Sequence, residues 1–166
     1  MDTLRMLKIV MVAGLALDAL LVAFGNITDY GSNFVYVEHV MSMDTTFPGS
    51  NLMYRSITMP ALHHAAYVLI IAGEGLAGLL LAFGAWQLWR ARTAAGAVFA
   101  AAKRPVALGL TAAFLVWFVA FMVFAGEWFA SWQSATWNGQ EYAFRFVVPL
   151  LLVMIFVMQP EERVSV

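Results

Sequence analysis

The sequence contains no cysteine and has few charged residues. The absence of cysteine excludes disulfide bonds, thiolate zinc or iron–sulfur sites, and a cysteine nucleophile. Only 11% of the 166 residues are charged and 63% are hydrophobic, whereas soluble domains carry about 25% charged and about 45–50% apolar residues. The formal net charge of −1 provides no basic surface for nucleic acid. The composition therefore predicts an integral membrane protein that lies in the lipid bilayer.

Recognisable catalytic motifs are also missing. There is no phosphate-binding glycine loop, no nucleophile elbow and no zinc-protease motif. These absences favour a non-enzymatic protein, and no cofactor is predicted. The length suits one domain over 1–166, and the sequence contains no internal repeat.

Four apolar stretches dominate the chain, at about 9–25, 61–89, 106–126 and 141–158. Each is close to the length of about 20 residues that crosses a bilayer as a helix. Because backbone groups in lipid must be satisfied internally, we expect an all-α bundle of four transmembrane helices. The first stretch has an alternative interpretation as a signal peptide, since Arg5 and Lys8 precede it. Asp18 would interrupt the apolar core of such a peptide, so we favour a retained helix.

A connection of about 35 residues follows the first stretch, which is long for a link between two helices. Within it, residues 33–43 place Phe34, Val37, Val40 and Met41 on one helical face. This pattern predicts a short amphipathic helix in the outer loop. The second stretch carries small residues at 72–78, which allow close helix packing within the chain or with a partner.

Basic residues indicate the orientation in the membrane. If the four helices alternate, seven lie on one side: Arg5, Lys8, Arg90, Arg92, Lys103, Arg104 and Arg163. Only Arg55 and Arg145 lie on or near the other side. Cytoplasmic loops are enriched in lysine and arginine, so both termini should be cytoplasmic.

Asp18 and Glu74 are acidic residues within apolar stretches. A carboxyl group at that depth costs at least about 2.5 kcal/mol on insertion scales, so we expect both to be buried in protein. One interpretation is a structural role, with each group protonated or hydrogen-bonded. A second is a site that handles a proton, ion or solute, and a third is pairing with a basic group of a partner subunit.

Six polar residues are predicted to gather in the outer half of the bundle: Glu38, His39, His63, His64, Glu127 and Arg145. The simplest interpretation is a structural cap, with Arg145 paired to Glu127 and the histidines bonded to loop backbone. The alternative is a metal or haem site at His39 with His63 or His64. Against it, the other three apolar stretches contain no histidine, whereas haem bundles use histidines from facing helices.

Aromatic residues are abundant, with thirteen Phe, six Trp and five Tyr. They are typical of packing and of the membrane interface, although they could also line a quinone or lipid pocket.

Several segments resemble a bacterial family described as predicted small integral membrane proteins, a domain of unknown function. They are residues 33–48, Arg55, 60–67, Glu74, 84–86, 88–90, 126–129, 132–134, 137–140 and 144–146. The resemblance spans nearly the whole chain. It implies four transmembrane helices in a bacterial inner membrane, and it implies no activity.

These observations favour an accessory or assembly subunit of a larger inner-membrane complex, such as a respiratory one. Its partners would be other membrane subunits or a second copy of the chain. One alternative is a small proton- or solute-handling transporter that uses the carboxyl groups of Asp18 and Glu74. Another is a redox protein that binds haem or a quinone.

Overall fold

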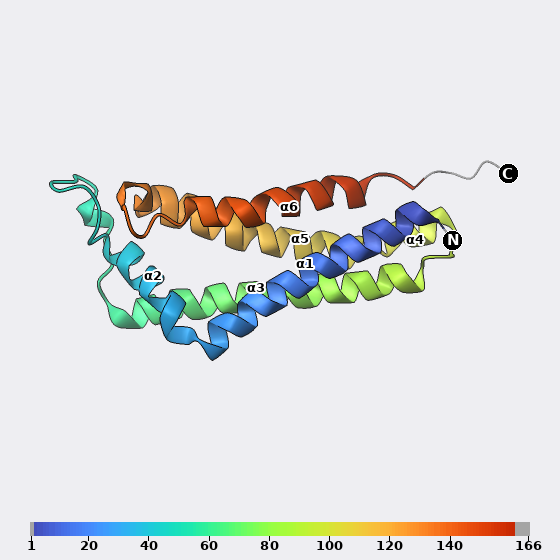
Figure 1. The fold of residues 1–166 in the computed structure, drawn as a ribbon, viewed down its shortest axis with the longest axis horizontal. Helices are drawn as coiled ribbons and strands as arrows, with labels where there is room; N and C mark the ends of the chain where they lie inside the picture. Colours follow the sequence, from blue (N-terminus) through green and yellow to red (C-terminus); the bar gives the residue numbers. More distant parts are fainter. Residues whose placement is uncertain (1, 162–166) are drawn as a thin grey trace.

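The computed structural model describes residues 2–161, and every regular element within them is a helix. The long helices run roughly parallel to the longest axis of the molecule (Figure 1). The start of α1 (Thr3–Thr28) lies at one end, which we call the terminal end, and α2 (Tyr30–Ser42) lies toward the other, which we call the α2 end (Figure 1).

Four helical segments are long and apolar enough to cross a membrane. They are α1 (Thr3–Thr28), α3 (Pro60–Arg90), α6 (Gln140–Met158), and Gly96–Trp128, which comprises α4 (Gly96–Ala101), α5 (Arg104–Phe114) and the π-helix η2 (Leu115–Trp128). The predicted all-α architecture with four transmembrane helices is confirmed.

The connection between α1 and α3 contains the predicted amphipathic helix. This helix, α2 (Tyr30–Ser42), buries Val37 and Val40 and begins three residues earlier than predicted. Two 3-10 turns, η1 (Met53–Arg55) and η3 (Ser131–Gln133), complete the α2 end. The first helix, predicted over about 9–25, is longer at both ends, because α1 begins at Thr3 and continues to Thr28, and it buries the polar side chain of Asn26.

Small residues allow α3 to pack closely against helices of the same chain. A Cβ atom on Gly78 would lie 2.7 Å from Leu20 Cγ of α1, and one on Gly84 would lie 3.0 Å from the backbone nitrogen of Val106 in α5. The predicted close helix packing is therefore confirmed within the chain.

The terminal half of the bundle has a filled apolar core, in which Leu88, Val106 and Val157 are fully buried. Large apolar side chains also cover the outside, as Leu17, Leu21 and Phe24 do on α1. Such a surface is stable only in an apolar surrounding, which is consistent with helices that face lipid.

Charged residues tie the terminal end together. The carboxylate of Glu161, just after α6, pairs with Lys8 Nζ at 2.8 Å, with Lys103 Nζ, and with Arg5 Nε at 3.5 Å. Arg5 Nη1 also donates to the carbonyl oxygen of Ala94, at 2.7 Å. These contacts join the start of α1, the α3–α5 connection and the segment after α6. Six of the seven basic residues predicted to share a side belong to segments at this end, and Arg163 lies outside the described residues.

Candidate functional site

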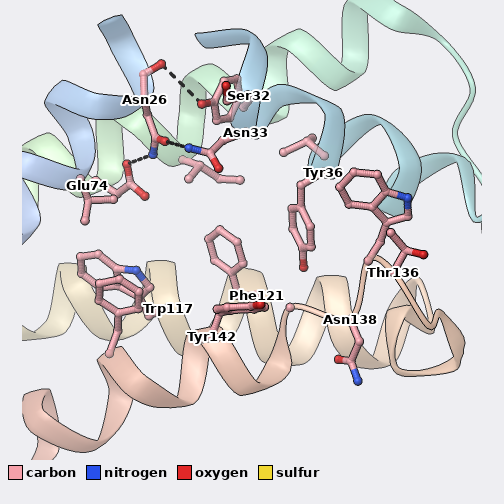
Figure 2. Close-up of a pocket in the computed structure, with 18 residues that line it drawn as sticks. Asn26, Ser32, Asn33, Tyr36, Glu74, Trp117, Phe121, Thr136, Asn138 and Tyr142 are labelled. Carbon is pink, nitrogen blue, oxygen red and sulfur yellow. Dashed lines mark hydrogen bonds between the residues drawn. The ribbon is translucent and has the colours of Figure 1, made fainter. Parts of the chain in front are cut away.

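A cavity of about 490 Å³ lies in the α2 half of the bundle, a volume typical of small-molecule sites. Residues from α1, α2 and α3 face residues from η2 and α6 across it (Figure 2). Its lining comprises Val22, Asn26, Ser32, Asn33, Tyr36, Val37, Tyr67, Ile70, Glu74, Trp117, Phe121, Thr136, Trp137, Asn138, Gly139, Tyr142, Ala143 and Phe146. Because Ser32, Asn33 and Thr136 are exposed, the cavity reaches the surface at the α2 end.

Of the described residues that line the cavity, Glu74 alone is charged, and it is only 1% exposed. Asn26 Nδ2 donates a hydrogen bond of 2.8 Å to Glu74 Oε2, and Asn33 Nδ2 donates one of 2.8 Å to Asn26 Oδ1. This chain of polar groups runs from the exposed Asn33 to the buried carboxyl (Figure 2). Among the described residues, Glu74 has no basic partner within ion-pair distance.

The wall opposite Glu74 is aromatic, with Trp117 and Phe121 from η2 and Tyr142 from α6 (Figure 2). Trp117 stacks on Phe146 with ring centroids 5.1 Å apart, and Tyr36 stacks on Phe121 at 5.8 Å. These stacked pairs give the cavity an apolar aromatic surface.

The Tyr36 hydroxyl is buried near the Ser131 side chain, but no group among the described residues meets the distance and angle of a hydrogen bond to it. Burial raises the pKa of Tyr36 to about 12, so its hydroxyl stays neutral and remains a potential donor. Gly139 permits this position, because a Cβ atom there would collide with the Tyr36 hydroxyl.

The long π-helix η2 is an unusual part of the cavity wall. Trp117 and Phe121 both lie on it. Such helices are rare, usually a single turn, and frequently occur at functional sites. Here the π-helix forms the half of the third membrane segment that faces the cavity.

Asp18 does not share this site. The prediction that both acidic residues are buried is correct for Glu74 and wrong for Asp18, which is exposed on α1. Asp18 borders a separate small gap beside Leu15 and Leu81. The two carboxyl groups therefore do not form a pair within one cavity, because they line different hollows of the bundle.

The six polar residues predicted in the outer half do not form one cluster. Glu127 accepts a hydrogen bond of 3.2 Å from Gln140 Nε2, while the Arg145 guanidinium lies 5.3 Å from the centre of the Tyr142 ring. No ion pair joins Glu127 to Arg145 in the described part of the chain. Glu38 is exposed on α2.

The three histidines make separate contacts. His63 Nε2 lies 2.6 Å from the carbonyl oxygen of Ile57, which agrees with the expected bond to loop backbone. His39 Nδ1 instead contacts the Asp44 carboxylate at 2.7 Å, and His64 Nδ1 contacts the Tyr30 hydroxyl at 2.8 Å. Within residues 2–161, no group of three or more potential ligands is arranged to hold a metal ion.

A family model described as predicted small integral membrane protein (DUF2165) matches residues 4–160. The chain belongs to this family. It is therefore a multi-pass integral membrane protein, as its resemblance to the family implied. No curated protein and no solved structure matches it significantly. Every residue that lines the cavity lies within the part of the chain that the family model covers.

Sequence reasoning identified Glu74 but missed most of its surroundings. Asn26 comes directly after the first apolar stretch, so it was not assigned to the helix. Its position four residues after Val22 nevertheless places it on the same helical face as Val22. Trp117, Phe121 and Tyr142 could not be separated from ordinary packing residues, because aromatic residues occur throughout the chain. The π-helical geometry of η2 leaves no signature in the sequence.

Proposed function

We propose that the protein is a small membrane transporter that binds a solute in the cavity and exchanges it for a proton at Glu74. The observation that carries this proposal is the buried Glu74 carboxyl, which lines an open cavity and has no basic neighbour among the described lining residues. An ionisable group at membrane depth is costly and typically marks a proton or substrate pathway. The other titratable groups in the lining are Tyr36, Tyr67 and Tyr142, none of which supplies a positive charge.

The shape of the cavity supports access from one side of the membrane at a time. The cavity reaches exposed residues at the α2 end, whereas Leu88, Val106 and Val157 fill the terminal half. In a transport cycle, the helices would rearrange to expose Glu74 to the terminal side.

The basic residues at the terminal end support a proposed orientation in the membrane. Because cytoplasmic loops carry an excess of lysine and arginine, the terminal end would face the cytoplasm and the α2 end the periplasm. The membrane would be the bacterial inner membrane. A reporter fused to the N-terminus would be active in the cytoplasm, and activity in the periplasm would contradict this orientation.

The transport proposal is tested with the purified protein in liposomes that are acidic inside and contain a pH-sensitive dye. A panel of small amphipathic cations, neutral molecules and anions is added outside, and protein-free liposomes give the passive baseline. We expect at least one solute to cause proton release that Glu74→Gln abolishes and the exposed Glu38→Gln preserves. Release that never exceeds the baseline, or that is unchanged in Glu74→Gln, would refute the proposal.

A second candidate role, as a subunit of a larger membrane complex, is supported by Asp18. This carboxyl is exposed near the middle of α1, where lipid would solvate it poorly. A partner helix with a basic or hydrogen-bonding residue would cover it. Purification from native membranes in mild detergent would recover a complex that Asp18→Asn weakens, whereas recovery of free monomer would count against this role.

A further inference from the structure

We propose that the solute is a hydrophobic organic cation, of the quaternary or tertiary ammonium class, held between Glu74 and the aromatic wall. This inference rests on the proposed function, because it names the class of solute for the same cavity. It follows from the charge, the surface and the size of the cavity.

The charge of the lining favours a cation. Within residues 2–161, the lining of the cavity carries one full charge, on Glu74, and contains no lysine, arginine or histidine. A ligand with a carboxylate or phosphate group would be disfavoured. The described lining residues offer it no positive partner, and the Glu74 carboxyl would repel it. A cationic ligand would instead neutralise Glu74, because a buried charge is tolerated when it is paired.

The aromatic wall favours an organic cation. Seven of the lining residues are aromatic: Tyr36, Tyr67, Trp117, Phe121, Trp137, Tyr142 and Phe146. Tryptophan, tyrosine and phenylalanine rings attract ammonium groups that approach their faces within about 6 Å. Glu74 lies across the cavity from Trp117 and Phe121 (Figure 2), so a cation between them would have the carboxylate on one side and aromatic rings on the other.

The ligand set argues against an inorganic cation, because Glu74 is the one carboxylate among the described lining residues and no group of three or more His, Cys, Asp or Glu residues within 2–161 could hold a metal ion. Hard metal ions take about six or more oxygen ligands in close coordination. Here Asn26 already donates to Glu74, and its own side-chain oxygen accepts from Asn33. The cavity of about 490 Å³ is also far larger than a bare ion. Alkyl or aryl groups on the cation would fill this space and bury apolar surface.

Exchange of one proton for one monovalent cation would leave the net charge of the cavity unchanged. One monovalent cation enters, forms an ion pair with the Glu74 carboxylate, and one proton leaves to the water at the α2 end. Reprotonation of the carboxylate releases the cation.

The test compares benzyltrimethylammonium with neopentylbenzene, in which carbon replaces the charged nitrogen. The fluorescence of Trp117 and Trp137, which line the cavity, reports binding to the full-length protein in detergent. Protein-free micelles correct for partitioning of the neutral compound. We expect the cation to bind at least about tenfold more tightly, since ion pairing and cation–π contacts together exceed the 1.4 kcal/mol that corresponds to tenfold.

Three variants complete the test. Glu74→Gln should weaken cation binding at least about tenfold without affecting the neutral compound, Glu74→Asp should retain part of it, and Glu38→Gln should retain all of it. Equal binding of the two compounds would overturn the cation inference but leave a solute-binding cavity, and thus the proposed function, in place. Binding of neither compound would overturn the cation inference, and the liposome panel would then decide the proposed function separately. If Glu74→Gln fails to fold, the comparison of the two compounds on the unaltered protein still decides the question.

Discussion

Asn26 on α1 and Glu74 on α3 form a buried hydrogen bond of 2.8 Å across the interface of the two helices. The Tyr67 hydroxyl donates to the carbonyl oxygen of Asn26 at 3.4 Å, and Asn33 holds the Asn26 side chain. The costly carboxyl is therefore fixed by an amide, which orients it without neutralising its charge. Under the proposed function, Glu74 binds a proton or a cation in this arrangement.

Asn26→Ala should destabilise the protein by about 1–3 kcal/mol, because it leaves a buried carboxyl without its hydrogen-bond donor. Thermal unfolding in detergent measures the change. The matched control is Asn51→Ala, since Asn51 is exposed and surface substitutions usually stay within about 0.5 kcal/mol. When Glu74 is already replaced by glutamine, Asn26→Ala should lower the free energy of unfolding by a smaller amount. An equal cost in both backgrounds would mean that the two side chains are not coupled.

Gly84→Ala should weaken the packing of α3 against α5 by about 1–3 kcal/mol, because overpacking forces the backbone to move. A Cβ atom on Gly84 would lie 2.5 Å from Val106 Cγ2 and 3.0 Å from the Val106 backbone nitrogen. Gly75 lies on the same helix with open space around its Cβ position, so Gly75→Ala should cause no loss of stability. We expect the thermal midpoint of Gly84→Ala to be lower than that of Gly75→Ala. A lower midpoint for Gly75→Ala would contradict the close packing of α3 against α5.

Glu161 should make the stability of the terminal end depend on pH. Burial by itself would raise the pKa of the Glu161 carboxyl, but hydrogen bonds and charges from Lys103 and Lys8 outweigh it and hold the pKa below the ordinary value of 4.5. A carboxyl with a depressed folded-state pKa contributes its stability above the unfolded-state pKa and loses it as pH falls through the folded-state pKa.

Glu161→Gln should therefore lower the thermal midpoint at neutral pH. Its difference from the unaltered protein should vanish as the pH falls below the folded-state pKa of Glu161. Thermal unfolding of both proteins over a pH series checks the prediction, with Glu127→Gln as the control at the opposite end. A difference that persists undiminished in acid would show that the ion pairs with Lys8 and Lys103 are not its source.

Tyr36→Phe should keep or raise the stability, because the buried Tyr36 hydroxyl has no partner among the described residues. Tyr30→Phe is the matched comparison, since it removes the contact of the Tyr30 hydroxyl with His64 at 2.8 Å. A typical hydrogen bond contributes about 0.5–1.5 kcal/mol. Unfolding measurements at neutral pH should thus rank Tyr36→Phe above Tyr30→Phe, and a large loss for Tyr36→Phe would reveal a hydrogen bond made by its hydroxyl.

The membrane fold could be predicted from the sequence because long apolar stretches have few alternatives in a bilayer. Even the amphipathic helix over α2 followed from the spacing of Val37 and Val40. The site was harder to predict. Glu74 stands out in an apolar stretch, but the same signal at Asp18 belongs to an exposed residue, since the apolar pattern does not specify which face of a helix is buried. The contacts of Asn26 and Glu161 join segments far apart in the chain, which no local pattern indicates.

The most direct test of the account is the reaction of Glu74 with a membrane-permeant carbodiimide, followed by mass spectrometry of the labelled carboxyl groups. Carbodiimides modify protonated carboxyl groups that they can reach in an apolar environment. We predict that Glu74 is labelled and that benzyltrimethylammonium slows its labelling at least about tenfold, while labelling of the exposed Asp18 is unchanged. Reaction at Asp18 without reaction at Glu74, or labelling of Glu74 at the same rate with and without the cation, would contradict the account.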